Sequence, residues 1–174
     1  MPMSDAVERT QLSDEPLPRG ACTCGSLRKA SRRMSQFYDC ALAPVGIRST
    51  QFSILAEVER GSLEGPMTMC ELASAMIMDR STLGHNLRPL QRDELLILRA
   101  GQLDRRKRYV ELTRKGKAML PKARRLWRRA EGRFEKIFGK RRAAELRAVL
   151  LNIANNKEFQ TRRGNTSRSM HVDC

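Results

Sequence analysis

Residues 69–116 constrain the fold of this chain more than any other segment, because two short amphipathic helices there precede a basic turn. The first helix is expected over residues 70–76. The second is expected to begin at a cap formed by Asp79 or Ser81. Its apolar side chains recur at helical spacing and define one buried face, formed by Leu83, Leu87 and Leu90. Together the two helices predict a helix-turn-helix.

A β-hairpin is expected next, with strands at residues 95–99 and 108–112 around the sequence AGQLDRRK. Gly101 favours a turn, and we expect Asp104 to pair with an arginine and hold this wing in shape. The tip of the wing is strongly cationic and comprises Arg105, Arg106, Lys107 and Arg108. The predicted fold class is therefore mainly α, an α+β winged helix.

The 174 residues suffice for one well-cored domain. Residues 1–20 are polar and are expected to form a disordered arm, and residues 157–174 a flexible tail. Between them we expect one domain over residues 21–156, with the winged helix at about 49–113.

Two further helical regions, at about residues 21–43 and 113–156, are amphipathic but lie outside the winged helix. Pairing of these helices between two chains would bury them, so we predict an obligate homodimer. Pro121 is expected to bend or interrupt the helix that Thr113 caps. The positions of that helix expected to be buried are Met119, Leu120, Ala123, Leu126, Trp127, Ala130, Phe134, Ile137 and Phe138.

A second amphipathic helix carries Phe52, Ile54, Leu55 and Val58, and Ser49 or Thr50 is expected to cap it.

The net charge of +15 favours polyanionic partners, nucleic acid above all. No run of about twenty apolar residues occurs, and acidic residues occupy the place of a signal-peptide core, so we expect a cytoplasmic protein with no membrane partner. Five cysteines, an odd number, favour reduced thiols over a disulfide scaffold.

The exposed face of the helix expected to begin at Asp79 or Ser81 carries hydroxyl, amide, imidazole and guanidinium groups, which bind phosphates and base edges. These candidate DNA contacts are Ser81, Thr82, His85, Asn86 and Arg88. In a twofold dimer, two such helices and two wings would match a pseudo-palindromic duplex site.

Other classes of function find less support. The only histidines, His85 and His171, lie on the predicted DNA face and in the tail, so no nucleophile is paired with a base and we predict no enzyme. No cofactor or metal site is predicted. A basic RNA-binding protein stays open as an alternative, because it would also explain the charge.

The sequences ELASAM, DRSTLGHNLRPLQRDELL and LDRRKRYVELTRKG resemble the MarR family of winged-helix regulators over roughly residues 22–156. The most specific part is Asp104-x-Arg106 followed by Leu112, Thr113 and Gly116. The resemblance implies a homodimeric DNA-binding regulator, usually a repressor, that a small-molecule ligand or an oxidant releases from DNA. The chain has Glu94 where the family usually has glycine, so we expect that turn to differ in geometry.

The chain also resembles the branch of this family that senses organic hydroperoxides. Cys24 precedes Ala30, Ser31 and Arg32, and Tyr38 follows nearly on the same helical face. Three interpretations of Cys22 and Cys24 stay open at this point: inert thiols, a redox switch that involves Tyr38, and a soft-metal site.

Overall fold

The computed structural model describes residues 18–63, 65–101 and 104–159. It divides into two units, residues 1–34 and 35–174, which are treated separately below. Helix α1 (Thr23–Leu42) begins in the first unit and ends in the second. The arm predicted over residues 1–20 and the tail predicted over residues 157–174 lie largely outside the described residues.

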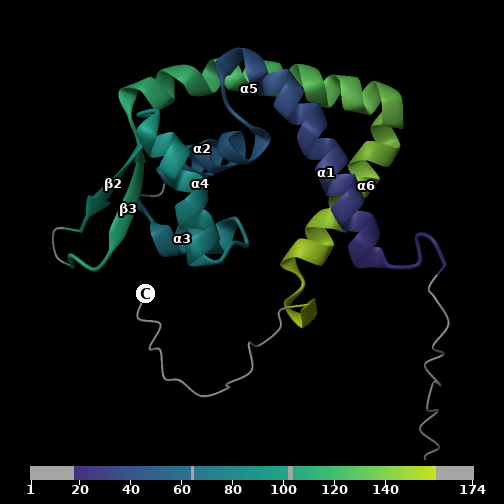
Figure 1. Cartoon of the computed structure of the whole chain (residues 1–174), viewed down its shortest axis with the longest axis horizontal. Helices are drawn as coiled ribbons and strands as arrows, with labels where there is room; N and C mark the ends of the chain where they lie inside the picture. The colour runs from purple at the N-terminus through teal and green to yellow at the C-terminus, as the bar shows by residue number, and fades with distance from the viewer. Residues whose placement is uncertain (1–17, 64, 102–103, 160–174) are drawn as a thin grey trace, which may run out of the picture. The chain divides into compact units, whose positions relative to one another are not determined.

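The second unit contains a helix-turn-helix, a three-stranded antiparallel sheet and two long C-terminal helices (Figure 1). This arrangement is a winged helix, as predicted. After α1, the order is η1 (Ala43–Val45), α2 (Ser49–Gly61), β1 (Met67–Thr68), α3 (Met69–Ala75), α4 (Arg80–Arg92), β2 (Leu96–Ala100), β3 (Arg108–Leu112), α5 (Arg114–Phe138), α6 (Lys140–Asn155) and η2 (Lys157–Phe159).

The sheet has the strand order β1-β3-β2. Val110 in the central strand pairs with Leu98 on one side and Met67 on the other. The β2–β3 hairpin was predicted from local sequence. Strand β1 was not, because two residues carry no alternating pattern.

Leucines of α4 form the centre of the hydrophobic core. Leu83, Leu87 and Leu90 are almost completely buried, as their spacing predicted. Buried side chains of α2, α3 and α5 join the same cluster, among them Ile54, Leu55, Leu72, Leu120 and Ala123. Since α4 and α5 both turn their apolar faces into this cluster, their polar faces point away from it.

The start of α2 differs from the expectation. Neither Ser49 nor Thr50 is the N-cap, which is Arg48 instead. The free backbone N–H of Ser49 donates to the Asp39 carboxylate at 2.6 Å, and Arg48 N–H donates to Gln51 Oε1 at 2.8 Å. A carboxylate near the end of α1 therefore satisfies the first turn of α2.

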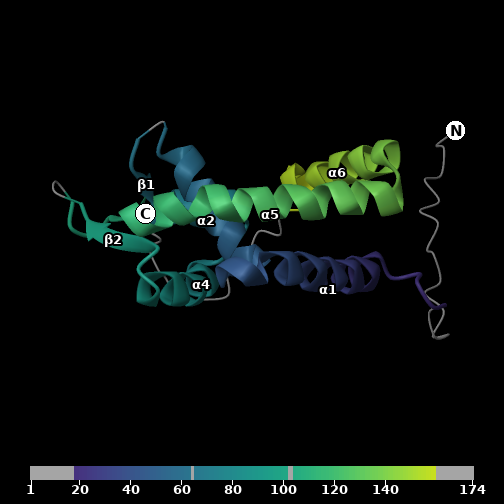
Figure 2. The same cartoon turned by 90° about the horizontal axis from the view of Figure 1, so that it is seen from above.

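Helix α5 begins where Thr113 was expected to cap it, and the Thr113 hydroxyl accepts the N–H of Gly116 at 3.0 Å. The expected interruption at Pro121 is wrong, because α5 runs unbroken from Arg114 to Phe138. Figure 1 shows α6 turning downward at a steep angle from the end of α5, and Figure 2 shows the same helix from above. Contacts join the two helices.

Two helices end in a left-handed residue that is not glycine. Glu94 has φ 56° after α4, and Ile77 has φ 51° after α3. In each case the backbone N–H of the next residue donates a hydrogen bond to the carbonyl five positions earlier in the chain. Leu95 N–H donates to the Leu90 carbonyl at 2.8 Å, and Met78 N–H donates to the Ala73 carbonyl at 2.9 Å. These are Schellman endings. The Glu94 turn thus keeps the left-handed geometry that glycine favours, contrary to expectation.

In the part of the chain that the structure describes, no helix is both long and apolar enough to cross a membrane.

Candidate nucleic-acid interface

Asp79 organises the first turn of α4. Its carboxylate accepts the Ser81 hydroxyl at 2.6 Å, the Thr82 N–H at 2.8 Å and the Thr82 hydroxyl at 2.8 Å. The Ser81 bond first, and then the two Thr82 bonds, hold the pKa of this carboxyl far below its usual range. Both hydroxyl hydrogens are therefore committed to the cap, and the exposed lone pairs of Ser81 and Thr82 are acceptors.

The remaining predicted contacts of α4 lie one and two turns further along. The Asn86 amide donates to the Thr82 carbonyl at 2.8 Å, which leaves its Oδ1 and one N–H available. His85 and Arg88 are exposed, and neither makes a hydrogen bond or ion pair with any residue that the structure describes. Arg88 is thus an unpaired cation on this helix face.

The wing is held by backbone bonds at its tip. Asp104 Oδ1 accepts the backbone N–H of Arg106 at 2.9 Å, and the Asp104 carbonyl accepts the N–H of Lys107 at 3.1 Å. Asp104 therefore shapes the turn through the backbone of an arginine, not through a guanidinium as expected. A Cβ on Gly101 would lie 2.5 Å from the Asp104 carbonyl oxygen, so only glycine fits at that position.

The predicted cations of the wing are all exposed: Arg105, Arg106, Lys107 and Arg108. None of them forms an ion pair within the described part of the chain. Below them, Arg99 of β2 pairs with Glu111 of β3 at 2.9 Å across the hairpin. The wing thus holds its own acidic residues in structural bonds and presents cations at its tip.

A groove of about 700 Å³ joins the wing to the helix-turn-helix. It brings Arg106, Lys107 and Arg108 together with Arg80, the first residue of α4. Sequence reasoning missed Arg80, although its place directly after the Asp79 cap was a usable signal. Glu71 also lines the groove, but its carboxylate accepts the Thr68 N–H at 2.7 Å, and this bond lowers its pKa. Asp104 lines the groove too, and its carboxylate accepts the Arg106 N–H. The groove therefore combines four cations with two carboxylates that are both engaged in backbone hydrogen bonds.

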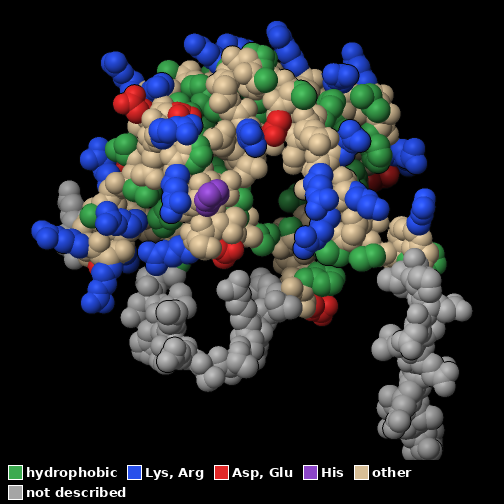
Figure 3. All heavy atoms as spheres, in the orientation of Figure 1, with side chains coloured by type: hydrophobic (Ala, Val, Ile, Leu, Met, Phe, Trp, Pro, Cys, Tyr) green, Lys and Arg blue, Asp and Glu red, His purple; other side chains and the backbone are tan. Residues whose placement is uncertain are grey.

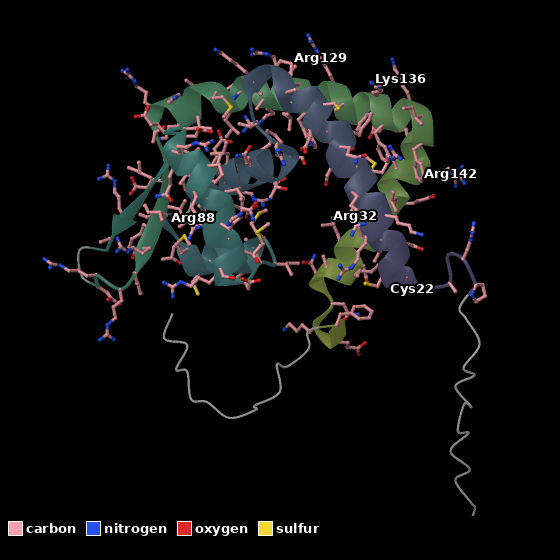
Figure 4. The ribbon with its side chains drawn as sticks, in the orientation of Figure 1. Cys22, Arg32, Arg88, Arg129, Lys136 and Arg142 are labelled. Carbon is pink, nitrogen blue, oxygen red and sulfur yellow. The ribbon has the colours of Figure 1, made fainter. Side chains whose placement is uncertain are left out.

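Lys and Arg side chains gather at the wing and again along the edge formed by α5 (Figure 3). The labelled Arg88 lies on α4, whereas Arg129 and Lys136 project from α5 (Figure 4). Cationic surface is thus present in two separate places in the second unit.

The first unit carries the two cysteines of interest. The sulfur of Cys22, just before α1, accepts the backbone N–H of Gly25 at 3.3 Å. Cys22, Cys24 and Cys40 are exposed free thiols. No group of three or more His, Cys, Asp or Glu side chains within the described residues is arranged to hold a metal ion.

Tyr38 takes part in a polar network between helices. Its hydroxyl donates to the Glu131 carboxylate, which also binds Arg147 of α6. Arg147 donates to Glu135 as well, at 3.1 Å. Burial, followed by the bond to Glu131, raises the pKa of Tyr38 well above its usual value. The hydroxyl of Tyr38 is therefore tied to α5 and α6.

Neither the protein-family models nor the curated proteins include a match to this chain. Among solved structures, the M. tuberculosis transcriptional regulator MosR in complex with DNA is 38% identical, with a TM-score of 0.68, and the match covers 76% of this chain and 93% of MosR. The chain belongs to the MarR family of transcriptional regulators.

Two other members of the MarR family are also similar. The repressor CouR bound to a 23-mer DNA duplex is 26% identical, with a TM-score of 0.68, over 80% of this chain and 99% of CouR. The E. coli MarR mutant solved with operator DNA is 19% identical, with a TM-score of 0.66, over 75% of this chain and 91% of MarR, and shares the fold. CouR from Rhodococcus jostii has also been solved with p-coumaroyl-CoA, a match of 19% identity with a TM-score of 0.64 over 79% of this chain and 94% of CouR. These proteins are regulators without enzymatic activity, as predicted for this chain.

Proposed function

We propose that this MarR-family protein is a cytoplasmic, homodimeric repressor that binds a pseudo-palindromic duplex DNA site. The observation that carries the proposal is the juxtaposition of α4 and the wing around one cationic groove. Arg80 and the wing cations line this groove, while Arg88 stays unpaired on the exposed face of α4. Side chains of this kind bind phosphates at the groove edges and bases between them. The DNA duplexes bound to MosR and CouR support the same partner here.

Within this interface the residues divide by role. Arg88, His85 and Asn86 would reach base edges in the major groove, because they have free polar atoms on the exposed face of α4. The wing cations and Arg80 would bind phosphates or enter the minor groove. Ser81 and Thr82 would contribute acceptors, since their hydrogens are given to Asp79.

The homodimer is supported by apolar side chains that one chain leaves in solvent. Ile137 is 71% exposed, Val149 57% and Leu151 61%, all on α5 or α6. Isolated exposed apolar residues are common, but several on two adjacent helices indicate an interface. Association of two chains through α5 and α6 would bury them.

The signal that releases DNA is proposed to be oxidation of Cys24 or binding of a small molecule. Cys22 and Cys24 are exposed at the start of α1, where the helix end favours negative charge. Tyr38 is bound to Glu131, so we assign it to the packing of α5 and α6 and not to thiol chemistry. The structure of CouR bound to p-coumaroyl-CoA is an example of a small molecule bound by this fold.

Selection of genomic fragments by the full chain, with and without an organic hydroperoxide, tests this proposal. Without the hydroperoxide, the bound fragments should share an inverted repeat. With the hydroperoxide, the protein should no longer bind these fragments. Cys24→Ser should bind DNA normally and stay bound under oxidant, whereas Cys40→Ser is the matched control and should respond like the wild type. A Cys24→Ser variant that still releases DNA would contradict the redox step.

The same experiment separates the alternatives. Structured RNA that competes better than duplex DNA would favour an RNA-binding protein. Stoichiometric binding of As(III) or Zn²⁺ that Cys22→Ser and Cys24→Ser abolish would favour a soft-metal sensor.

A further inference from the structure

The outer face of α5 carries a row of cations that the proposed DNA interface does not use. At about 100° per residue, these side chains fall within an arc of about 140° on the helix. We call this row the α5 stripe; it consists of Lys117, Lys122, Arg125, Arg128, Arg129 and Lys136. All six are exposed.

The α5 stripe lies opposite the buried face of its helix. Leu120, Ala123 and Ala130 are buried, and α5 packs with that side on α2 and β3. The stripe is centred roughly 180° away from them by the same helical count. Figure 4 agrees, since Arg129 and Lys136 project outward from α5. The stripe therefore faces away from the core that α4 and α5 share.

Carboxylates do not neutralise the α5 stripe. The two acidic residues of α5, Glu131 and Glu135, both bind Arg147 of α6. Glu131 lies outside the arc of the stripe, and Glu135 lies at its edge, at the same angle as Lys117. Arg124 and Arg133, the other cations of the middle of α5, are engaged with Glu59 and with the Phe37 ring. By contrast, no stripe residue forms an ion pair with any residue that the structure describes. Six unpaired cations on one face attract a polyanion.

The shape of the α5 stripe favours double-stranded DNA among polyanions. From Lys122 to Lys136 it extends about 21 Å, which matches about six base pairs at 3.4 Å per step. Apart from Glu135 at the edge of the arc, small or cyclic side chains lie between the cations, namely Ala118, Pro121 and Gly132. A membrane-binding helix needs large apolar side chains beside its cations, and single-stranded nucleic acid needs exposed aromatic rings.

Building on the function proposed above, we infer that the α5 stripe binds the phosphate backbone of a second DNA duplex, independent of sequence. One chain would then hold two DNA segments, one at α4 and the wing and the other along α5. Once α4 and the wing are bound to DNA, neighbouring segments of the same DNA molecule are present at high effective concentration. Weak phosphate contacts then suffice for the stripe to bind one of these segments. The stripe would thereby connect two segments of one DNA molecule.

A bridging assay with the full chain tests this inference. A mixed-sequence duplex is fixed to beads, protein is bound, and retention of a second, fluorescent duplex is measured. The stripe variant Lys122→Gln, Arg125→Gln, Arg129→Gln should bind the fixed duplex like the wild type but retain about tenfold less of the second duplex. The salt dependence of second-duplex binding should fall by about 0.9 in slope for each contact removed.

The matched control removes three cations elsewhere: Lys140→Gln, Arg141→Gln, Lys157→Gln. It should bridge like the wild type, and equal melting temperatures of both variants confirm folding. Bridging by the stripe variant at the wild-type level would overturn the inference, as would stronger capture of anionic vesicles or duplex RNA than of DNA. A wild-type protein that binds the fixed duplex but does not retain the second duplex would overturn the inference about the stripe and leave the proposed function intact. Failure to bind the fixed duplex overturns the proposed function and the inference with it.

Discussion

A Cβ atom added to Gly116 would lie 2.0 Å from the carbonyl oxygen of Leu95. The same carbonyl accepts the N–H of Thr113 at 3.2 Å, and the Thr113 hydroxyl donates to the Glu94 carbonyl at 2.6 Å. The start of α5 is thus hydrogen-bonded directly to the turn that follows α4. Glycine at position 116 makes that close approach feasible.

Gly116→Ala is therefore expected to destabilise the protein by roughly 2–3 kcal/mol, because backbone must move to relieve the clash. Chemical denaturation measures the loss. Gly132→Ala is the matched control in the same helix, where no heavy atom lies within 4 Å of the added Cβ. It should be neutral or stabilising by up to about 1 kcal/mol. Equal effects at the two positions would contradict the packing argument.

Ile77→Gly should stabilise the protein by about 1 kcal/mol, since a left-handed β-branched residue is strained by roughly that amount or more. The isoleucine side chain is 67% exposed, so its removal forfeits little burial. Ile77→Ala keeps the strain and serves as the control. If the melting temperature rose equally for both variants, the gain in stability would come from removal of the exposed apolar side chain and not from relief of backbone strain.

The cap at Asp79 predicts a pH dependence. Its pKa in the folded state is far below the ordinary 3.8, so its contribution to stability is present above that value and is lost as pH falls below about 4 toward the folded pKa. Asp79→Asn keeps a good N-cap but removes the titration. The difference in melting temperature between wild type and Asp79→Asn should be constant near neutral pH and shrink below pH 4. A difference independent of pH would contradict this assignment.

Tyr38→Phe should cost about 1 kcal/mol of unfolding free energy, the usual net value of one hydrogen bond. The pKa of Tyr38 is raised in the folded protein, so its contribution holds below the ordinary value of 10.0 and declines as pH rises above it. Tyrosinate absorbance should show a late-titrating group that Tyr38→Phe removes. Tyr109→Phe is the control, and persistence of the late component in Tyr38→Phe would exclude the assignment.

Arg88 and Arg105 should differ in their effect on DNA binding. Loss of a base contact lowers affinity for the preferred site by about 1–3 kcal/mol and relaxes its sequence preference, which is the result expected for Arg88→Ala. Arg105→Ala should weaken all duplexes alike and reduce the salt slope by about one. Binding titrations on the selected site and on mixed-sequence DNA distinguish the two. The assignments would be reversed if Arg105→Ala alone changed the preferred sequence.

Local patterns predicted the parts of the fold that depend on local sequence. Helix α4 followed from the spacing of its leucines, and the wing from a glycine turn between two short β-type runs. Features that join distant segments were not predictable in this way: the Asp39 bond to the start of α2, the pairing of β1 with β3, and Arg80 facing the wing. Each depends on where the chain returns in space.

The pattern of α5 gave a different result at its two ends. Leu120, Ala123 and Ala130 are buried as predicted, while Ile137 and Phe138 are exposed. Periodicity identifies an apolar face, but it does not say whether the same chain or a second chain covers that face.

The Asp79 cap has a chemical consequence for what the first turn of α4 can read. Because the hydroxyls of Ser81 and Thr82 donate their hydrogens to Asp79, they can only accept hydrogen bonds from DNA. Phosphate oxygens, which also offer only electron pairs, are poor matches for them. The exocyclic amino groups of cytosine and adenine carry the complementary hydrogens in the major groove. The Asp79 carboxylate at the start of α4 thereby favours contacts between the first turn of this helix and bases that carry an amino group.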